Sequence, residues 1–271
     1  MHYCDSCENK LKDAKYLWIN ERIYKSCPAC SNNAGEDIFY RCPEDFGTTK
    51  KRISSNNPAG LQSYCSKCRS NKQGPHENAI TCSELSSKNG VVISEIRFLP
   101  MSKDIFPTYE DAKEFILYEM PNRGNIYYYM KSKMDCKDNA FILFQHAGTL
   151  IGYAIFDKMI ALDEPINVDD AIYTGYYVFK SGSIRLFKNP ITADMFSKID
   201  PMFKAFSQSH QIKPVGILPT IFKVIEDGEG SIRPNDNITS LPEEIDEQEG
   251  KGLKEGHKKQ IIVNAYERNL F

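Results

Sequence analysis

Residues Asn125–Phe156 read NIYYYMKSKMDCKDNAFILFQHAGTLIGYAIF, and this stretch predicts the centre of the fold. Two short runs within it, Ala140–Phe144 and Ile151–Phe156, are apolar and rich in β-branched and aromatic side chains, which favour strands. Gly148 lies between them, and glycine supplies the positive φ that a tight turn requires. The pattern predicts a β-hairpin. Because its first strand is almost wholly apolar, we expect that strand to be covered on both faces.

The triple tyrosine in Ile126–Met130 predicts a further strand just before the hairpin. Side chains alternate along a strand, so Tyr127 and Tyr129 share one face while the tyrosine between them takes the other. The runs Ile172–Phe179 and Ser183–Phe187 continue the β pattern. We therefore expect a small β-rich domain whose mouth could hold a flat ring.

A helix is predicted over Tyr109–Met120, ahead of these strands. Thr108 is a suitable N-cap, and Glu110 and Asp111 favour the positive end of the helix dipole. Pro121 is expected to end it.

Composition places the chain among folded globular proteins. Of its 271 residues, 41% are hydrophobic and 26% charged, and the length suits one large domain or two modest ones. The sequence contains no apolar run of membrane-span length, and its first residues lack the apolar core of a signal peptide. We expect a cytoplasmic protein with no membrane partner. A net charge of −2 gives no global attraction to nucleic acid, so phosphate contacts would come from local basic patches.

The cysteines are clustered rather than dispersed. Eight of the nine lie in Cys4–Cys82, and six of these form Cys-x-x-Cys pairs, which in a reducing compartment indicates metal rather than disulfides. Cys4 and Cys7 are followed about twenty residues later by Cys27 and Cys30, a spacing typical of two knuckles that close one zinc site. We expect structural zinc there.

A second set of ligands follows, and its membership is ambiguous. Four further thiols are available, and His76 could replace either outer one; alternatively Cys27 and Cys30 could pair with Cys65 and Cys68. We expect two separate Zn²⁺ sites. The predicted metal ligands are Cys4, Cys7, Cys27, Cys30, Cys42, Cys65, Cys68 and Cys82.

The stretch Arg41–Arg69 resembles the zinc-binding modules that accompany bacterial HNH endonucleases. The resemblance rests on Phe46, on Gly60-Leu61, and on Cys65 and Cys68. The basic residues of this region fit either a solvated surface or phosphate contact. The predicted phosphate-binding residues along the chain are Lys50, Lys51, Arg52, Lys131, Lys133, Arg185 and Lys188.

The strand, polar loop, AFILF, glycine turn and IGYAIF together resemble the core of the PUA-like superfold, which includes the EVE, ASCH, YTH and SRA domains. The resemblance covers residues 93–225 and implies a small barrel that takes one nucleobase into an aromatic pocket. Base flipping of this kind recovers the cost of unstacking through new stacking and edge hydrogen bonds. A core or surface role is the plainer interpretation for any single tyrosine. The predicted base-binding residues are Tyr127, Tyr129, Tyr153, Tyr173 and Tyr176.

The C-terminal region changes character. Residues 226–256 are acidic and rich in Gly and Pro, as in a flexible linker. His257–Phe271 resembles the lead-in to the nuclease module of bacterial HNH endonucleases, including modification-dependent restriction enzymes, through Val263–Asn269 (VNAYERN). The chain departs from that family because it stops at Phe271 before any His-rich metal motif. We therefore expect no catalytic residues here, although the parent protein would be an endonuclease.

These observations predict an α+β protein in four segments. Zinc ribbon or knuckle modules occupy 1–90, a PUA-like domain 91–225, a linker 226–256 and a truncated nuclease lead-in 257–271. The predicted function is recognition of DNA, with a modified base flipped into an aromatic pocket, as the specificity part of an HNH restriction endonuclease. The missing nuclease domain would be a route to a homodimer. Two alternatives stay open, an RNA-binding PUA-like module and a zinc-stabilised protein-interaction adaptor.

Overall fold

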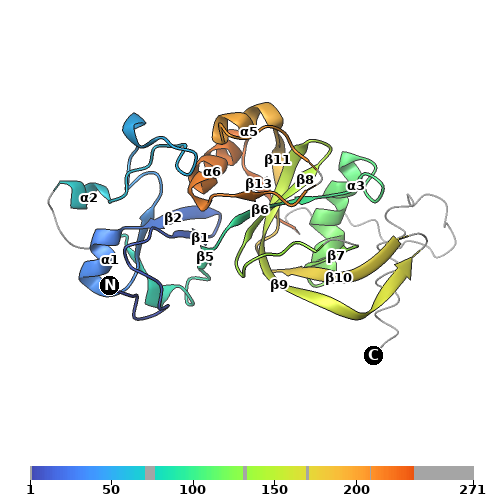
Figure 1. Ribbon diagram of the computed structural model, residues 1–271, viewed down its shortest axis with the longest axis horizontal. Coiled ribbons are helices and arrows are strands. Elements are labelled where there is room, and N and C mark those ends of the chain that lie inside the picture. The colour runs from blue at the N-terminus through green and yellow to red at the C-terminus, as the bar shows by residue number, and fades with distance from the viewer. Residues whose placement is uncertain (1, 71–76, 131–132, 169–170, 208, 235–271) are drawn as a thin grey trace. The chain divides into compact units, whose positions relative to one another are not determined.

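The computed structural model describes residues 2–70, 77–130, 133–168, 171–207 and 209–234. These residues form a mixed α+β structure that is mostly sheet (Figure 1). They divide into two compact units. Unit 1 comprises the described residues of Met1–Ile96, Asp194–Lys204 and Lys213–Glu226, and unit 2 comprises those of Arg97–Ala193, Ala205–Ile212 and Asp227–Phe271. None of the helices in the described residues has the length and apolar character needed to span a membrane.

Unit 1 is built on a five-stranded sheet in the order β4-β3-β2-β1-β5, and each pair of neighbouring strands is antiparallel. Its β1–β2 hairpin closes through Asn20 and Glu21, both at positive φ, with Ile19 opposite Arg22.

The elements of unit 1 are β1 (Tyr16–Ile19), β2 (Arg22–Ser26), α1 (Pro28–Ala34), β3 (Ile38–Arg41), η1 (Lys50–Arg52), α2 (Ser66–Arg69), β4 (Ile80–Thr81), η2 (Cys82–Glu84), β5 (Val91–Ile93), α5 (Ala193–Ile199), η4 (Val215–Ile217) and α6 (Leu218–Asp227).

Unit 2 is a curled, half-barrel sheet whose strands follow the path β12-β6-β8-β9-β10-β7, with β11 pairing both β9 and β13. The long strand β9 makes the curl possible because its first part pairs with β8 and β11 and its later part with β10. The elements are β6 (Ile96–Pro100), α3 (Tyr109–Glu114), η3 (Phe115–Glu119), α4 (Met120–Asn122), β7 (Ile126–Tyr129), β8 (Phe141–His146), β9 (Thr149–Val168), β10 (Ala171–Phe179), β11 (Arg185–Thr192), β12 (Ile212–Lys213) and β13 (Ser231–Ile232).

The hairpin predicted from the central stretch is confirmed. β8 and β9 pair antiparallel with His146 opposite Thr149, and Ala147 and Gly148 form the two-residue turn with φ of 48° and 79°. Two positive φ angles are the mark of the type I′ turn, whose twist matches that of the flanking strands. Every residue of β8 is buried, which confirms the expectation for its apolar part, Phe141–Phe144, and extends to the polar Gln145 and His146.

The helix predicted over Tyr109–Met120 is confirmed in position but differs in form. Thr108 caps α3 and accepts a hydrogen bond from the Asp111 backbone N–H at 3.3 Å. The chain then widens into a π-helical turn, η3, and continues through Pro121 to Asn122 in α4. Pro121 was expected to end the helix, but the helical segment ends one residue later, at Asn122.

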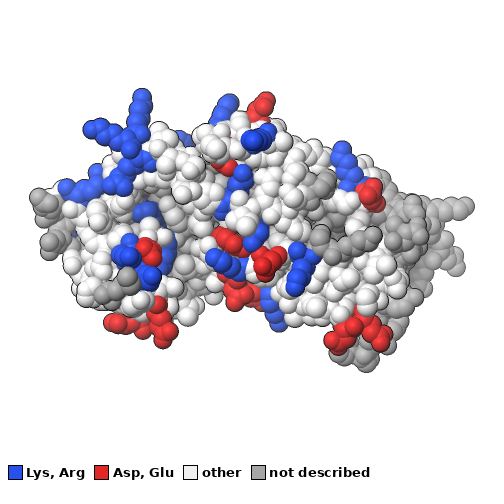
Figure 2. Space-filling model, viewed as in Figure 1, with Lys and Arg blue, Asp and Glu red and all other residues white. Residues whose placement is uncertain are grey.

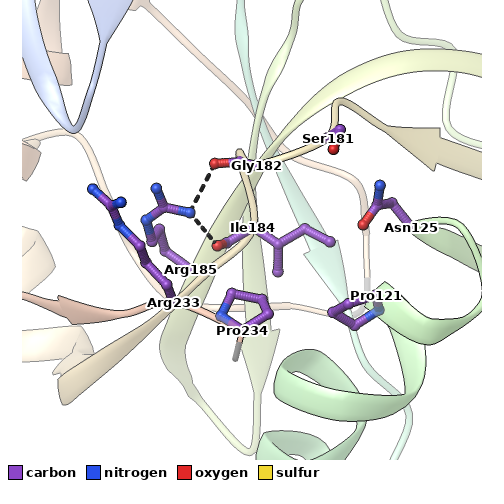
Figure 3. Close-up of a pocket in the computed structure, with 8 residues that line it drawn as sticks. All are labelled: Pro121, Asn125, Ser181, Gly182, Ile184, Arg185, Arg233 and Pro234. Atoms are coloured by element: carbon purple, nitrogen blue, oxygen red, sulfur yellow. Dashed lines mark hydrogen bonds between the residues drawn. The ribbon is translucent and has the colours of Figure 1, made fainter. Parts of the chain in front are cut away.

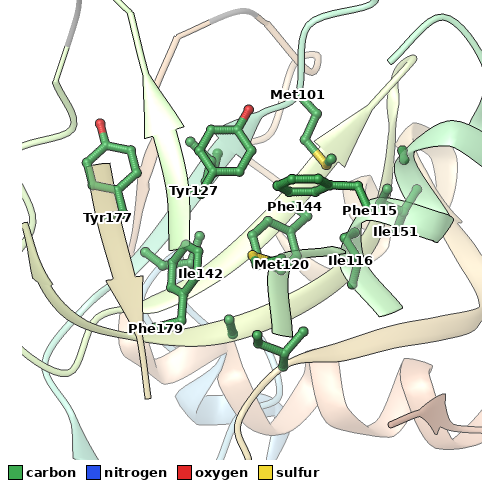
Figure 4. Packing of buried hydrophobic residues seen from close by; sticks show 14 of the residues in the cluster. Met101, Phe115, Ile116, Met120, Tyr127, Ile142, Phe144, Ile151, Tyr177 and Phe179 are labelled. Carbon is green, nitrogen blue, oxygen red and sulfur yellow. The ribbon is translucent and has the colours of Figure 1, made fainter. Parts of the chain in front are cut away.

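The core of unit 2 lies between this helical segment and the curled sheet (Figure 4). Phe115 makes an edge-to-face contact with Tyr127 at a centroid distance of 5.7 Å, and Phe144 makes one with Phe179 at 5.5 Å. Tyr127 and Tyr129 belong to this core, whereas Tyr128 packs in a separate cluster on the opposite face of β7. The alternation expected of the triple tyrosine is therefore confirmed.

Candidate metal centres

Four cysteines of unit 1 form a first group, centre 1, that could bind a metal ion. The sulfur atoms of Cys27, Cys30, Cys65 and Cys68 all lie within 4.8 Å of one another. Cys30 Sγ lies 3.4 Å from Cys68 Sγ and 3.8 Å from Cys65 Sγ. A tetrahedral Zn²⁺ with Zn–S bonds of about 2.3 Å holds its sulfur atoms about 3.8 Å apart. Because all four are free thiols, the group fits a tetrahedral metal rather than a disulfide.

Both cysteine pairs of centre 1 use the same local geometry. Cys27 is the N-cap of α1 and Cys65 is the N-cap of α2, so the second cysteine of each pair falls in the first turn of its helix. Residues three apart in a helix lie on one face, which brings the two sulfurs of each pair together. The Cys65 backbone N–H also donates to Cys27 Sγ at 3.4 Å, which joins the two knuckles.

Within centre 1, hydrogen bonding among the thiols favours the thiolate form of Cys27. The hydrogen bond from the Cys65 thiol lowers the pKa of Cys27 to about 4, and the same contact raises the pKa of Cys65. Burial raises the pKa of Cys68 to about 12. A metal ligates thiolate sulfur, so metal binding here must release the protons that the other thiols hold.

A second group, centre 2, could also bind a metal ion. It contains Cys4, Cys7, Cys82 and the carboxylate of Asp37, with all ligand atoms within 4.8 Å of one another. The Asp37 backbone N–H donates to Cys4 Sγ at 3.4 Å, and Cys7 Sγ lies 3.6 Å from Asp37 Oδ2. Carboxylate oxygen is an accepted ligand for Zn²⁺.

Asp37 lies directly before β3 and is fully buried. Burial raises the pKa of its carboxyl group, and the hydrogen bond and charge of Lys15 act in the opposite direction. Lys15 Nζ lies 2.8 Å from Asp37 Oδ1, which leaves Oδ2 on the side of Cys7. Sequence reasoning did not identify Asp37, since a single aspartate before a strand carries no ligand pattern.

The grouping of the cysteines differs from the first expectation, in which Cys4 and Cys7 shared a site with Cys27 and Cys30. The alternative pairing of Cys27 and Cys30 with the Cys65 knuckle is the one observed. Backbone hydrogen bonds explain the other group: the Asp5 N–H donates to Gly35 O at 3.1 Å, and the Cys82 N–H donates to Asp37 O at 2.9 Å. These bonds bring the first knuckle and Cys82 to the start of β3.

Cys42, which was also predicted as a ligand, belongs to neither group. Its N–H donates to Ile23 O at 3.0 Å, at the end of the antiparallel β2–β3 ladder away from Cys27. The four residues from Ile23 to Cys27 span about 13 Å of strand, too far for a shared ligand sphere. Burial raises the pKa of Cys42 to about 12, so it is a protonated thiol.

Basic side chains gather on the loops between β3 and α2, which lead into Cys65 and Cys68 of centre 1. Lys50, Lys51 and Arg52 form η1, and all three are exposed. Figure 2 shows a concentration of blue side chains at its upper left, over the loops between β3 and α2. Arg69 at the end of α2 is also exposed, and its guanidinium donates to Phe46 O at 2.6 Å.

The buried side chain of Lys25, on β2, contacts residues of these loops and holds them to the sheet. Its ammonium group donates to Ser63 O at 2.9 Å and lies 4.1 Å from the centroid of the Phe46 ring. Burial lowers its pKa to about 8. Asn57 adds hydrogen bonds to Arg52 O at 3.2 Å and Leu61 O at 3.0 Å, so the basic loop is anchored at several points.

The tyrosines predicted to contact a base are mostly interior. Tyr153 and Tyr173 are fully buried, Tyr127 and Tyr129 are 7% exposed, and Tyr176 is partly buried. Tyr129 stacks on neighbouring Tyr177 at a centroid distance of 4.7 Å. Their predicted contact with a base stays a prediction.

The remaining predicted phosphate contacts are dispersed over unit 2. Lys133 and Lys188 are exposed, whereas Arg185 is buried and its Nη1 donates to the carbonyls of Gly182 and Ile184. The predictions for His76, Lys131 and the segment 257–271 fall outside the described residues, as does most of the predicted linker.

No protein-family model matches the chain, and no curated protein matches it.

Proposed function

We propose that both centres hold structural Zn²⁺ and that the protein binds DNA through the basic loops of centre 1. Thiolate-rich tetrahedral sites favour zinc among the common divalent ions because Zn²⁺ accepts sulfur ligands and needs no particular d-electron geometry. Neither centre has the three-ligand open arrangement of a catalytic zinc site, since four protein ligands surround each one. A structural role follows.

The observation that carries the DNA-binding proposal is the exposed η1 turn of Lys50, Lys51 and Arg52 on a fixed scaffold. Residues 41–70 contain six basic and two acidic side chains, although the whole chain has a net charge of −2. Local excess positive charge on a rigid surface is what contact with a phosphate backbone requires. Ser63 accepts a hydrogen bond from the Arg52 guanidinium at 2.7 Å, which further orders this surface.

Recognition of a modified base by unit 2, as part of an HNH restriction endonuclease, is the more specific form of the proposal. Its support is the curled sheet together with the sequence resemblance of the β8–β9 hairpin to PUA-like domains. The four buried tyrosines would have to become accessible before any of them could stack on a base. The nuclease resemblance depends on residues 257–271, outside the described residues.

Fluorescence anisotropy with a labelled 20-base-pair duplex would test the proposal. We expect binding at low salt whose affinity falls as salt rises, with a slope of about 0.9 per phosphate contact on a log–log plot. The triple variant Lys50→Gln, Lys51→Gln, Arg52→Gln should lower both the affinity and the salt slope. The same measurement is made with unmodified, methylated and hydroxymethylated duplexes of one sequence and with RNA of that sequence.

A matched control changes the same charge elsewhere: Lys103→Gln, Lys158→Gln and Lys223→Gln are all substitutions of exposed lysines outside the basic loops. It should bind as the wild type does. The proposal fails if the wild type does not bind DNA at low salt, if the two triple variants lose affinity equally, or if RNA is preferred. Equal affinity for the three duplexes would remove the modified-base claim alone.

A further inference from the structure

A pocket of about 360 Å³ lies in unit 2, and its described lining includes no candidate metal ligand. Two tight turns build it. The chain leaves α4 through Asn125, which has a positive φ of 65°, and it leaves β10 through a turn in which the Ser183 N–H donates to Lys180 O at 3.1 Å. The Phe179 N–H donates to Asn125 O at 3.0 Å and ties the two turns together. The segment after β13 supplies Arg233.

Two arginines reach this pocket from different elements. Arg185 is only 4% exposed, and hydrogen bonds from its Nη1 to Gly182 O at 2.8 Å and Ile184 O at 2.6 Å fix the position of its guanidinium. Arg233 is exposed. Among the described residues the lining contains no Asp or Glu. A fixed guanidinium beside a second, more exposed one is suited to a phosphate group, which arginine binds through paired N–H donors.

The rest of the lining has a different character. Figure 3 shows the two guanidinium groups toward one end of the pocket and the side chains of Asn125 and Ser181 toward the other, with Ile184 between them. Pro121 and Pro234 add flat apolar surface. An asparagine amide carries both donors and an acceptor, which is the pattern that reads the edge of a nucleobase. The volume falls in the range of small-molecule sites.

We propose that this pocket binds the phosphate monoester of a nucleoside, with the phosphate on Arg185 and Arg233 and the base toward Asn125. The ligand is either a free mononucleotide or the 5′-phosphorylated end of a strand, since both present the same group. This site goes beyond the proposed function, because it involves neither the basic loops of centre 1 nor an aromatic base pocket.

Isothermal titration calorimetry on the full chain would test it with AMP, GMP, CMP and TMP, and with inorganic phosphate and the matching nucleosides. We expect at least one monophosphate to bind tenfold or more tightly than inorganic phosphate and than its own nucleoside. Arg233→Gln should lower the affinity for that monophosphate about tenfold, and Arg233→Glu should lower it further. Both change an exposed side chain, so folding is not expected to suffer.

Asn125→Gly is the second informative variant, because glycine accepts the positive φ at this position while the amide is lost. It should reduce the advantage of the monophosphate over inorganic phosphate. Lys103→Gln, which removes one exposed charge outside the pocket lining, should leave binding unchanged. A four-nucleotide strand with and without a 5′-phosphate distinguishes the sources: binding of the phosphorylated strand indicates a strand end, and binding of mononucleotides alone indicates a free ligand.

The proposal is overturned if no monophosphate binds, if inorganic phosphate binds as tightly as the monophosphates, or if Arg233→Gln leaves the affinity unchanged. Its failure is separable from that of the DNA proposal. The triple variant at Lys50, Lys51 and Arg52 should bind mononucleotides as the wild type does, whereas Arg233→Gln should retain duplex binding through the loops of centre 1.

Discussion

At the scale of single residues, chemically identical side chains have different roles according to their neighbours. Cys30 lies in the first turn of α1, with two other sulfurs within 3.8 Å. Cys42 is also buried but directly follows the far end of β3, where burial keeps its thiol protonated. The same residue type is thus a candidate ligand in one place and an apolar packing group in the other.

Substitution of these two cysteines distinguishes the roles. Cys30→Ser should lower the metal content of the purified protein from two ions per chain to one, because serine does not replace a thiolate in centre 1. Cys42→Ser should retain both ions. Inductively coupled plasma mass spectrometry measures the content directly. Loss of an ion from the Cys42 variant, or retention of both by the Cys30 variant, would contradict the assignment of centre 1.

At the scale of elements, the two units depend on different sources of stability. The large core cluster of unit 2 contains 22 buried residues between the α3–α4 segment and the curled sheet. One core cluster of unit 1 contains only seven, and two of those, Cys4 and Cys82, are candidate metal ligands. This small cluster surrounds ligands of centre 2, so we expect its packing to need the metal ion, while other apolar side chains of unit 1, such as Trp18, Phe46 and Leu218, are buried outside it. The sheet of unit 1 should therefore depend on its metal ions.

Metal removal provides the test, since Trp18 is the only tryptophan and lies buried in β1. A strong chelator at pH 7 should shift Trp18 emission to longer wavelength as unit 1 opens. Amide hydrogen exchange should stay slow in β8 and β9, because unit 2 has its own core. Restoring Zn²⁺ should reverse the emission shift. Unchanged emission from protein shown to be free of metal would contradict this dependence.

At the scale of the whole molecule, both units contain tyrosines whose ionisation opposes folding. Burial raises the pKa of Tyr16 in unit 1 and of Tyr127 and Tyr177 in unit 2 above the usual value of 10.0. A phenol with a higher pKa in the folded chain keeps its proton when the unfolded chain has released it. Its contribution to stability is therefore complete below pH 10 and is lost as the pH rises beyond that value.

The free energy of unfolding should accordingly decrease above about pH 10, and phenolate absorbance at 295 nm should rise together with loss of structure. Tyr127→Phe should reduce the alkaline loss of stability, because one titrating phenol is removed. Tyr64→Phe, at a side chain that is 46% exposed, serves as the control and should have little effect. Urea denaturation at pH 8 and at pH 11 measures the free energy of unfolding of the wild type and of the two variants. An equal effect of the two substitutions would contradict the argument.

Local sequence determined much of this protein. The Ala147–Gly148 turn, the Thr108 cap, the burial of β8 and the alternation of the triple tyrosine all follow from short-range geometry, because each depends on residues a few positions apart. The Cys-x-x-Cys pairs likewise fix which sulfurs meet within a knuckle. The sequence by itself thus predicted the presence of two cysteine-rich sites and of the hairpin.

Tertiary structure decided which knuckles share a site. The antiparallel β2–β3 ladder separates Cys42 from Cys27, and the backbone bond from Cys82 to Asp37 brings a carboxylate into centre 2. The pocket of Asn125 and Arg233 likewise unites turns more than a hundred positions apart. The spacing of residues along the chain does not predict such long-range contacts. Strand direction and pairing, rather than local propensity, determine which distant residues become neighbours.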